Sequence, residues 1–198
     1  MWRSMSARKY NISEIFFSLQ GEGFHTGLPA VFVRMSGCDL HCPWCDTDFS
    51  TRLTLTAGAI AAEADRLYPP YGGTRLLVLT GGEPTLQADE ELTGTLHGHG
   101  FSICIETNGT RPVPHGIDWV TCSPKAGSAP VLTEADEVKV VYTGDSPEHW
   151  RQKIKARHWL LQPLDNNGLQ NTQETVAYIL KHPGWRLSLQ THKAAGFK

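Results

Sequence analysis

Short apolar runs alternate with longer stretches of mixed polarity along most of the chain. Eight runs have the length and the Val, Ile and Leu content of β-strands: Ile12–Leu19, Ala30–Met35, Arg75–Thr80, Phe101–Thr107, Ile117–Ser123, Glu137–Tyr142, His158–Gln162 and Trp185–Gln190. Four intervening stretches are typical of helices: Ala57–Tyr68, Asp89–His97, Pro147–Arg157 and Thr172–Lys181. This alternation predicts an α/β fold whose parallel strands are joined by helical crossovers.

Length and charge narrow the class of protein. The chain has 198 residues, enough for one domain with a buried core, which we place at residues 10–198. Residues 1–9 lack the apolar middle of a secretory signal and are expected to form a leader without an assigned function. With a net charge of −2, no basic run and no apolar segment of about 20 residues, we expect a cytoplasmic protein that binds a small molecule, not nucleic acid or a membrane.

Three of the five cysteines lie close together, in the spacing C-x3-C-x2-C. Cys38, Cys42 and Cys45 can hold three irons of a cubane cluster, which leaves the fourth iron open to an outside molecule. That arrangement favours radical chemistry. Cys104 and Cys122 lie singly in apolar runs and are expected to be small buried hydrophobes, so the cysteines indicate a reducing compartment and no disulfide framework.

A structural zinc ion is the alternative metal that these cysteines would bind. Zinc requires a fourth protein ligand, and His25 and His41 are the candidates. The chain has no second C-x2-C pair, and His41 is an awkward fourth ligand because it stands directly beside Cys42. A zinc-stabilised binding module without enzyme activity therefore stays open as a second hypothesis.

Two motifs resemble those of the radical S-adenosylmethionine superfamily. Trp44 stands before the last cysteine of the loop, and Thr80-Gly81-Gly82-Glu83-Pro84 follows a predicted strand. The resemblance implies a [4Fe-4S] cluster, S-adenosylmethionine and a 5′-deoxyadenosyl radical that abstracts hydrogen, with no certain catalytic side chain. Because only one helix separates the cysteine loop from Leu79, we expect a partial, open TIM-type barrel of about six parallel strands with few helices.

Further segments are similar to the family of 7-carboxy-7-deazaguanine synthases. They are Phe17–Gly23, Gly27–Arg34, Cys45–Thr47, Glu106–Thr110, Ser123–Lys125, Gln162–Asp165 and Gln190–Lys193. The resemblance implies conversion of 6-carboxy-5,6,7,8-tetrahydropterin to 7-carboxy-7-deazaguanine with loss of ammonia, for queuosine-type bases. It also implies a homodimer and an electron donor such as flavodoxin or ferredoxin. A small activase that places a glycyl radical on a partner protein is the alternative within the superfamily.

The resemblance also implies a substrate site. Its residues are Leu19, Gln20, Gly21, Glu22, Arg34, Thr80, His192 and the terminal Lys198, whose carboxylate would contact the pterin. A carboxylate such as Glu22 suits an amidine-like pair of N–H donors, and Gln20 offers a donor and an acceptor. Arg34 is a natural bidentate partner for the substrate carboxylate, with a salt bridge to the protein as its alternative role. His192 has capping of the final strand as its alternative role.

By the same resemblance, a second set of residues would hold S-adenosylmethionine. It consists of Gly82, Glu106, Asn108, Ser123, Pro124, Lys125, Gln162, Pro163, Leu164 and Asp165. Thr47 would be a protein ligand of a magnesium ion next to the substrate, because magnesium keeps waters and takes oxygens from substrates. The alternative role of Thr47 is to cap a turn. The alternative for Asn108 is that Asn108-Gly109 forms an ordinary turn.

Overall fold

The computed structural model describes residues 7–70, 72–166 and 169–198. The first part of the chain forms β1 (Tyr10–Leu19), β2 (Pro29–Met35), β3 (Leu53–Leu55), α1 (Ala57–Leu67), β4 (Arg75–Gly81), the 3-10 helix η1 (Pro84–Leu86), α2 (Glu90–Gly98) and β5 (Phe101–Thr107). The second part forms β6 (Trp119–Cys122), β7 (Glu134–Tyr142), α3 (His149–Lys153), β8 (Lys155–Pro163), β9 (Asp165–Asn166), β10 (Leu169–Gln170), α4 (Thr172–Lys181), β11 (Arg186–Leu187) and α5 (Thr191–Ala195). None of the helices in the described ranges is long and apolar enough to cross a membrane.

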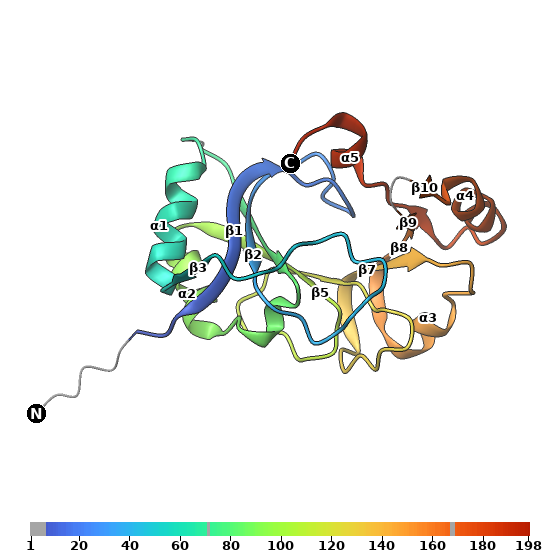
Figure 1. Cartoon of the computed structure of the whole chain (residues 1–198), viewed down its shortest axis with the longest axis horizontal. Helices are drawn as coiled ribbons and strands as arrows, with labels where there is room; N and C mark the ends of the chain where they lie inside the picture. Colours follow the sequence, from blue (N-terminus) through green and yellow to red (C-terminus); the bar gives the residue numbers. More distant parts are fainter. Residues whose placement is uncertain (1–6, 71, 167–168) are drawn as a thin grey trace, which may run out of the picture.

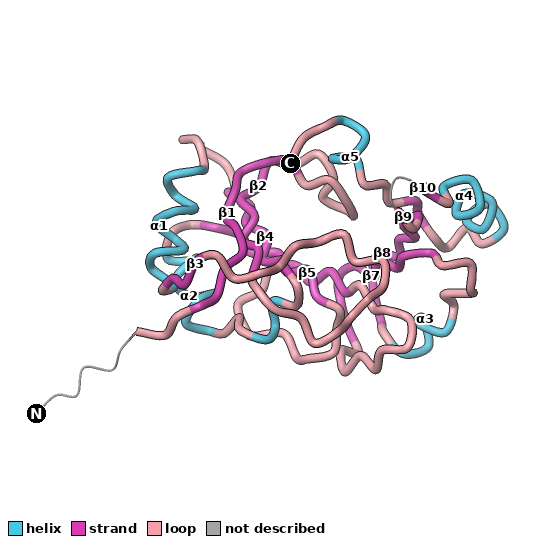
Figure 2. Tube along the Cα trace, in the orientation of Figure 1, coloured by secondary structure: helices cyan, strands magenta, loops and turns pink. Residues whose placement is uncertain are grey.

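One sheet of nine strands organises the molecule (Figures 1 and 2). The strand order is β11-β8-β7-β6-β5-β4-β2-β1-β3, and all neighbours from β11 to β2 are parallel. Within the described residues, β11 and β3 are the two edges and do not pair, so hydrogen bonds do not close the sheet. This confirms the expected α/β fold with an open, partial barrel, in which the short β11 extends the six longer parallel strands.

The N-terminal edge of the sheet differs from the expectation of parallel strands throughout. Strand β1 runs antiparallel to both β2 and β3. Only residues 20–28 connect β1 to β2, and a parallel connection needs a crossover of a dozen residues or more. The expectation was therefore wrong for β1, and the physical reason is the length of this hairpin.

Two other predicted elements are shorter than expected. Helix α3 ends at Lys153 because residues 155–157 belong to β8, where Lys155 pairs with Glu134 of β7. Strand β11 ends at Leu187, since the chain then leaves the sheet after a last backbone hydrogen bond from Ser188 to Leu161. The following residues form α5, which the apolar pattern did not predict; η1 and the short strands β3, β9 and β10 were also missed.

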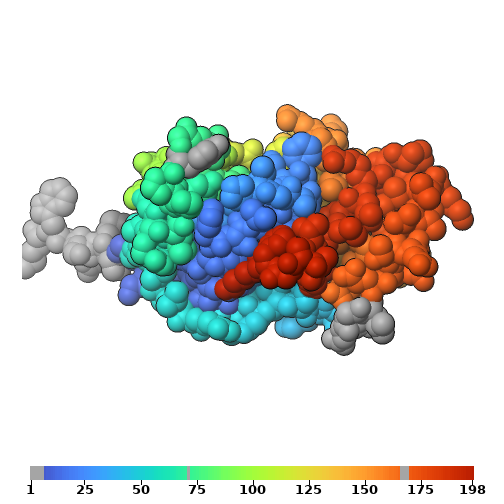
Figure 3. Space-filling view, turned by 90° about the horizontal axis from the view of Figure 1, so that it is seen from above, coloured from blue at the N-terminus to red at the C-terminus, as the bar shows by residue number. Residues whose placement is uncertain are grey.

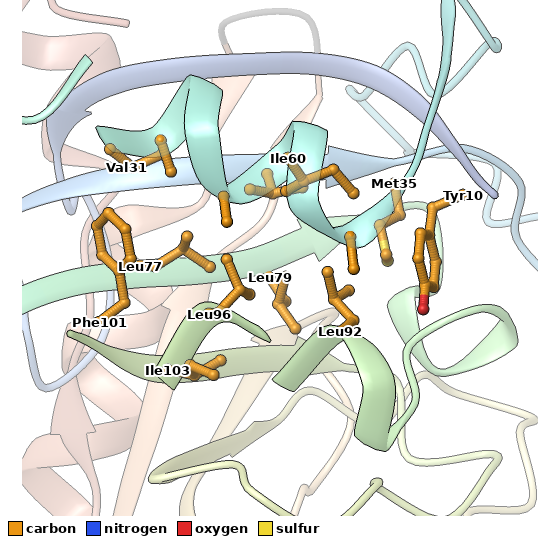
Figure 4. Close-up of a cluster of buried hydrophobic side chains, with 14 of the residues drawn as sticks. Tyr10, Val31, Met35, Ile60, Leu77, Leu79, Leu92, Leu96, Phe101 and Ile103 are labelled. Carbon is orange, nitrogen blue, oxygen red and sulfur yellow. The ribbon is translucent and has the colours of Figure 1, made fainter. Parts of the chain in front are cut away.

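The largest core cluster lies between the sheet and the helices α1 and α2 (Figure 4). Ile60 of α1 and Leu92 and Leu96 of α2 pack on alternate residues of the central strands, among them Leu77 and Leu79 of β4. All five side chains are fully buried. Burial of a Leu or Ile side chain contributes about 1.5–3 kcal/mol, so this layer holds the central strands in place.

The opposite face of the same strands changes from apolar to polar along its length. Side chains on alternate positions of a strand share a face, so Leu76 and Val78 of β4 line up with Thr80 at its end. Leu76 and Val78 belong to an apolar cluster on this inner face, whereas Thr80 lines a pocket. Arg34 of β2 is the register partner of Thr80 and lines the pocket too. The carboxyl ends of the parallel strands therefore carry the polar inner side chains.

Candidate functional site

A pocket of about 670 Å³ opens at the carboxyl ends of the strands. The long loop between β2 and β3, the β1–β2 turn, and the ends of β4, β5, β7 and β8 contribute side chains to its lining, as does the C-terminal segment. Figure 3 shows this C-terminal segment lying against the N-terminal strands. Ligands of parallel α/β folds bind at this end of the strands. Every residue predicted to bind substrate, S-adenosylmethionine or metal lines this pocket, except Pro124, which is buried beside it.

The three clustered cysteines line the pocket from the loop that follows β2. Cys38 and Cys42 are partly buried, and Cys45 is exposed. Two backbone contacts fix the start of the loop: Gly82 N–H donates to Met35 at 3.1 Å, and Glu83 N–H donates to Gly37 at 2.8 Å. A side chain on Gly82 would collide with the backbone of Gly37, so the Gly-Gly-Glu-Pro turn and the cysteine loop require glycine at this contact.

Glu83 of the same turn anchors the end of β5. It is 0% exposed, and its carboxylate accepts hydrogen bonds from the Thr107 hydroxyl at 2.7 Å and from the Asn108 backbone N–H at 2.6 Å. Asn108 in turn donates from Nδ2 to Asp39 of the cysteine loop at 2.9 Å. Asp39 also accepts from the Thr110 hydroxyl at 2.6 Å. The predicted Asn108 therefore ties the cysteine loop to the sheet in this structure.

The candidate zinc ligands do not complete a single-ion site with the cysteines. His25 points to another part of the molecule, where its Nδ1 lies 3.7 Å from Cys104 and its ring packs on Trp119. Among the described residues, no three His, Cys, Asp or Glu side chains are grouped closely enough to share one metal ion. Cys104 and Cys122 are buried, and burial raises the pKa of each thiol to about 12, which confirms the prediction of small buried side chains.

The opposite side of the pocket contains a ring of hydrogen-bonded polar side chains. Lys139 of β7 contacts the Glu22 carboxylate, and its Nζ lies 3.8 Å from Oε1 of Glu106. Gln20 donates to Glu106 at 3.0 Å and accepts at 3.1 Å from the Glu22 backbone N–H. Gln190 donates to Glu22 at 2.9 Å. Each of these side chains also lines the pocket.

The charges in this ring stabilise one another. Burial alone would raise the pKa of Glu22, but the charge and hydrogen bond of Lys139 lower it to about 2. Burial likewise opposes ionisation of Lys139, yet the carboxylates of Glu106, Glu22 and Glu137 raise its pKa above the ordinary value. Burial raises the pKa of Glu137, whose carboxylate accepts from the Phe24 backbone N–H at 2.6 Å. Glu22 is therefore an ionised acceptor in the pocket at neutral pH.

Arg34 of β2 also lines the pocket. Its Nε donates to Glu14 at 2.9 Å, so the protein salt bridge considered from the sequence is present. The described residues give its terminal nitrogens no hydrogen-bond partner, which leaves these N–H groups available to a ligand carboxylate. Lys198 also reaches Glu14, from Nζ at 2.5 Å, and its backbone oxygen accepts from the Ser18 hydroxyl at 2.6 Å.

The C-terminal segment contacts three parts of the pocket wall. Thr191 donates from its backbone N–H and its hydroxyl to the carbonyl of Gly21, both at 2.9 Å. A side chain on Gly21 would collide with the ring of His192, so a glycine allows this histidine to pack against the turn. Lys193 pairs with Asp46 at 2.5 Å and with Asp165 at 2.7 Å. Asp165, predicted from the sequence to hold S-adenosylmethionine, thus has a protein partner here.

The remaining predicted residues lie on the cysteine side of the pocket. Lys125 donates to the Ser123 hydroxyl at 2.6 Å, and its Nζ is 5.8 Å from the centre of the Trp44 ring. Burial lowers the pKa of Lys125. Thr47 lines the same wall, and its hydroxyl donates to Asp46 at 3.4 Å. Gln162 accepts from the Ser188 hydroxyl at 3.4 Å, and Pro163 and Leu164 follow it along the lining.

Several pocket residues were missed by the sequence reasoning. They are Lys139, Gln190, Asp46, Lys193 and Glu14; Asp39, which holds the cysteine loop to Asn108 but does not line the pocket, was missed as well. One of them had a signal: Lys139 interrupts the apolar run Val138 to Tyr142 at the centre of a predicted strand, and a lysine is rarely buried there without a partner. Asp46, Gln190 and Lys193 stand in two of the segments that are similar to the family, but their contacts could not be predicted, because their partners lie far away in the sequence.

A parallel α/β sheet with three clustered cysteines at its carboxyl edge defines a class of radical enzymes. The family model of the radical SAM superfamily matches residues 32–158 of the chain. The members of this superfamily use a [4Fe-4S] cluster and S-adenosylmethionine, and the chain is one of them.

Relatives identify the family within this class. A 7-carboxy-7-deazaguanine synthase of Bacteroides thetaiotaomicron is 52% identical over 182 residues, 92% of this chain and 95% of the relative. One from Nitratidesulfovibrio vulgaris is 42% identical over 94% of this chain and 98% of the relative. The crystal structure of QueE from Escherichia coli superposes with a TM-score of 0.75 at 32% identity, covering 93% of this chain and 95% of that one. The chain belongs to the 7-carboxy-7-deazaguanine synthase family, which removes the glycyl-radical activase and the zinc module as alternatives.

Proposed function

We propose that the protein converts 6-carboxy-5,6,7,8-tetrahydropterin to 7-carboxy-7-deazaguanine with loss of ammonia, as a step toward queuosine-type bases. One observation carries this proposal: a single pocket brings the C-x3-C-x2-C loop together with partly buried acceptors for a pyrimidine-like edge and with the available N–H groups of Arg34. The names of the relatives and the membership of the family support the same reaction.

The cysteine side fits the cluster and S-adenosylmethionine. Cys38, Cys42 and Cys45 provide three thiolates on one loop and leave the fourth iron without a protein ligand. When bound, the cluster supplies the electron that cleaves S-adenosylmethionine and so yields the radical that starts the ring contraction. Around this space, Gly82 offers exposed backbone, and Ser123 and Lys125 offer hydrogen-bond donors.

The other side fits the carboxylated pterin. Glu22 and Glu106 are acceptors for the N–H groups of its pyrimidine edge, and Gln20 adds a donor and an acceptor. Arg34 holds the carboxylate of the substrate through its terminal nitrogens, while Glu14 fixes the guanidinium from the other side. His192 and the end of the chain at Lys198 close the pocket next to the substrate.

Magnesium and the partners are part of the proposal. Thr47 lines the pocket beside Asp46 and offers a hydroxyl oxygen to a magnesium ion that takes its other ligands from water and substrate. The exposure of Cys45 supports electron delivery from outside, by a donor such as flavodoxin or ferredoxin. The protein acts in the cytoplasm as a homodimer, by analogy with its family.

The test is direct. The protein is reconstituted with iron and sulfide without oxygen, reduced, and incubated with S-adenosylmethionine, magnesium and the carboxylated tetrahydropterin. Mass spectrometry is expected to show 7-carboxy-7-deazaguanine, and an ammonia assay an equal amount of ammonia. Because the substrate minus ammonia already equals the product, the abstracted hydrogen is returned, and 5′-deoxyadenosine is expected only from uncoupled cleavage. Formation of 5′-deoxyadenosine without any deazaguanine would retain the radical chemistry and reject this substrate.

A further inference from the structure

Lys139 is the centre of the ring of polar side chains and has no role in the proposed reaction so far. It lies on the inner face of β7, with Glu137 and Val141 on the same face and the core residues Val138 and Val140 on the other. Its side chain is 5% exposed and still reaches the pocket lining. A lysine in such a place loses much of its hydration, so its partners have to account for its position.

The partners of Lys139 are the carboxylates on which the proposed substrate contact depends. Nζ contacts Glu22 and lies 3.8 Å from Glu106. Gln20 bridges the same two residues, because its side-chain amide donates to Glu106 and accepts from the Glu22 backbone. Gln190 holds the second oxygen of Glu22 at 2.9 Å. The two carboxylates are thus fixed relative to each other through Lys139 on one side and Gln20 on the other.

The charge balance explains why the lysine is needed. Two carboxylates in one partly buried pocket repel each other, which would push their side chains apart. A single ammonium between them reduces that repulsion and leaves the pair with one excess negative charge. Such a pair accepts hydrogen bonds from the N–H groups of an uncharged, amidine-like ring edge without requiring a positive charge on the ligand.

We propose that Lys139 is a positioning residue for the substrate, because its contacts with Glu22 and Glu106 hold both carboxylates in place, aimed at the pyrimidine edge of the pterin. This inference rests on the proposed function. It assigns Lys139 no contact with S-adenosylmethionine, which distinguishes it from Lys125, a partly buried lysine of the same pocket. Lys125 pairs with Ser123 on the cysteine side.

The experiment compares Lys139→Met with Lys125→Met in the cluster-loaded enzyme. Binding of the carboxylated tetrahydropterin and of S-adenosylmethionine is measured separately for each variant by equilibrium titration. Lys139→Met is expected to weaken binding of the pterin about 10- to 100-fold, because its loss leaves buried carboxylates without their partner, and to leave S-adenosylmethionine binding within about 3-fold. Lys125→Met is expected to show the reverse pattern. Lys139→Arg retains the charge and is expected to recover part of the lost pterin affinity.

A second variant covers the case in which Lys139→Met does not fold. Lys139→Met combined with Glu22→Gln removes the lysine together with its partner, so it is expected to fold and load the cluster. Because the lysine acts largely through Glu22, adding Lys139→Met to Glu22→Gln is expected to weaken pterin binding less than Lys139→Met weakens it in the wild type. Equal weakening of both ligands in the Lys139 variants, or pterin binding like that of the wild type, would overturn the inference. If the wild type itself fails to bind the pterin, the proposed function fails together with it.

Discussion

The two sides of the pocket are built in different ways. On the substrate side, the β1–β2 turn is closed by backbone hydrogen bonds from Gln20 to Leu28 at 2.8 Å and from Gly27 to Gln20 at 2.7 Å. On the cysteine side, residues 38–48, all of them described, make one backbone–backbone hydrogen bond, from Cys45 to Cys42. Side chains such as Asp39 hold that loop to the sheet, whereas the turn is held by its own backbone and by the C-terminal segment.

The difference shows which side depends on a ligand for its order. The substrate side is a satisfied network before any ligand binds, so it presents fixed acceptors and loses little conformational entropy on binding. The cysteine loop has three thiols and few bonds of its own, and cluster binding supplies the missing constraints. We therefore expect changes in the loop to affect cluster loading, and changes in the ring to affect the pterin.

The largest expected effect is that of Cys42→Ala. Two thiolates do not hold the cubane in place, so cluster binding and turnover are expected to be lost. Iron content, the iron–sulfur absorption band and 5′-deoxyadenosine formation measure this loss. Cys104→Ala is the matched control, because that thiol is buried away from the pocket and its removal should leave the iron content unchanged. Deoxyadenosine formation by Cys42→Ala would contradict the assignment of the loop.

Arg34→Ala tests the proposed contact with the substrate carboxylate. The variant loses a charge-assisted hydrogen bond, which is worth about 1.5–3 kcal/mol, so we expect pterin binding to weaken about 10- to 150-fold. The cleavage of S-adenosylmethionine without substrate is expected to change little. Titration with the pterin measures the binding, and an assay of uncoupled cleavage measures the second rate. Arg66→Ala removes an exposed pair with Glu63 on α1 and should change neither. Equal losses of binding and cleavage in Arg34→Ala would mean that the Glu14 salt bridge is its only role.

Gly82→Ala is expected to have a moderate effect on the cysteine side. The added methyl group would press on the backbone of Gly37 and on Cys38 and displace them, which is expected to lower the free energy of unfolding by about 1–3 kcal/mol. Unfolding of the cluster-free protein measures this cost, and the rate at which a chelator removes iron measures the effect on the cluster. Gly94→Ala in α2 meets no atom within 4 Å and is expected to stabilise slightly. Iron loss at the same rate in both variants would refute the close contact.

The last expected effect is confined to acid, where the stability of the folded protein depends on pH. The pKa of Glu22 is lowered from 4.5 to about 2 in the folded protein, so its contribution is full above pH 4.5 and declines as the pH falls toward 2. The difference in unfolding free energy between the cluster-free wild type and Glu22→Gln should therefore be constant above pH 4.5 and shrink below it. Chemical denaturation at several pH values measures this difference in unfolding free energy. A difference that grows as the pH falls would contradict the prediction.

Local patterns in the sequence predicted the strands and the cysteine loop. The features that depend on contacts between distant residues could not be predicted in this way. Apolar runs such as Leu76 to Leu79 predicted β4 because they are buried on both faces, and the cysteine spacing marked the loop by itself. The antiparallel direction of β1 had a signal in the sequence, because too few residues separate its apolar run from the next one for a parallel crossover. The apolar pattern could not pair Lys139 with Glu22 or Lys193 with Asp46, because these partners meet only through the tertiary fold. The binding roles assigned from the family resemblance stay predictions.

Amide hydrogen exchange of the cluster-free and the cluster-loaded protein tests the contrast between the two sides most directly. We predict that the amides of residues 38–48, apart from the hydrogen-bonded Cys45 and from Pro43, which has no amide hydrogen, exchange rapidly without the cluster and become protected once it is loaded. Those of Gln20, Gly27 and Thr191 are expected to be protected in both states. A cysteine loop that is protected before loading, or a β1–β2 turn that gains protection only with the cluster, would contradict this account.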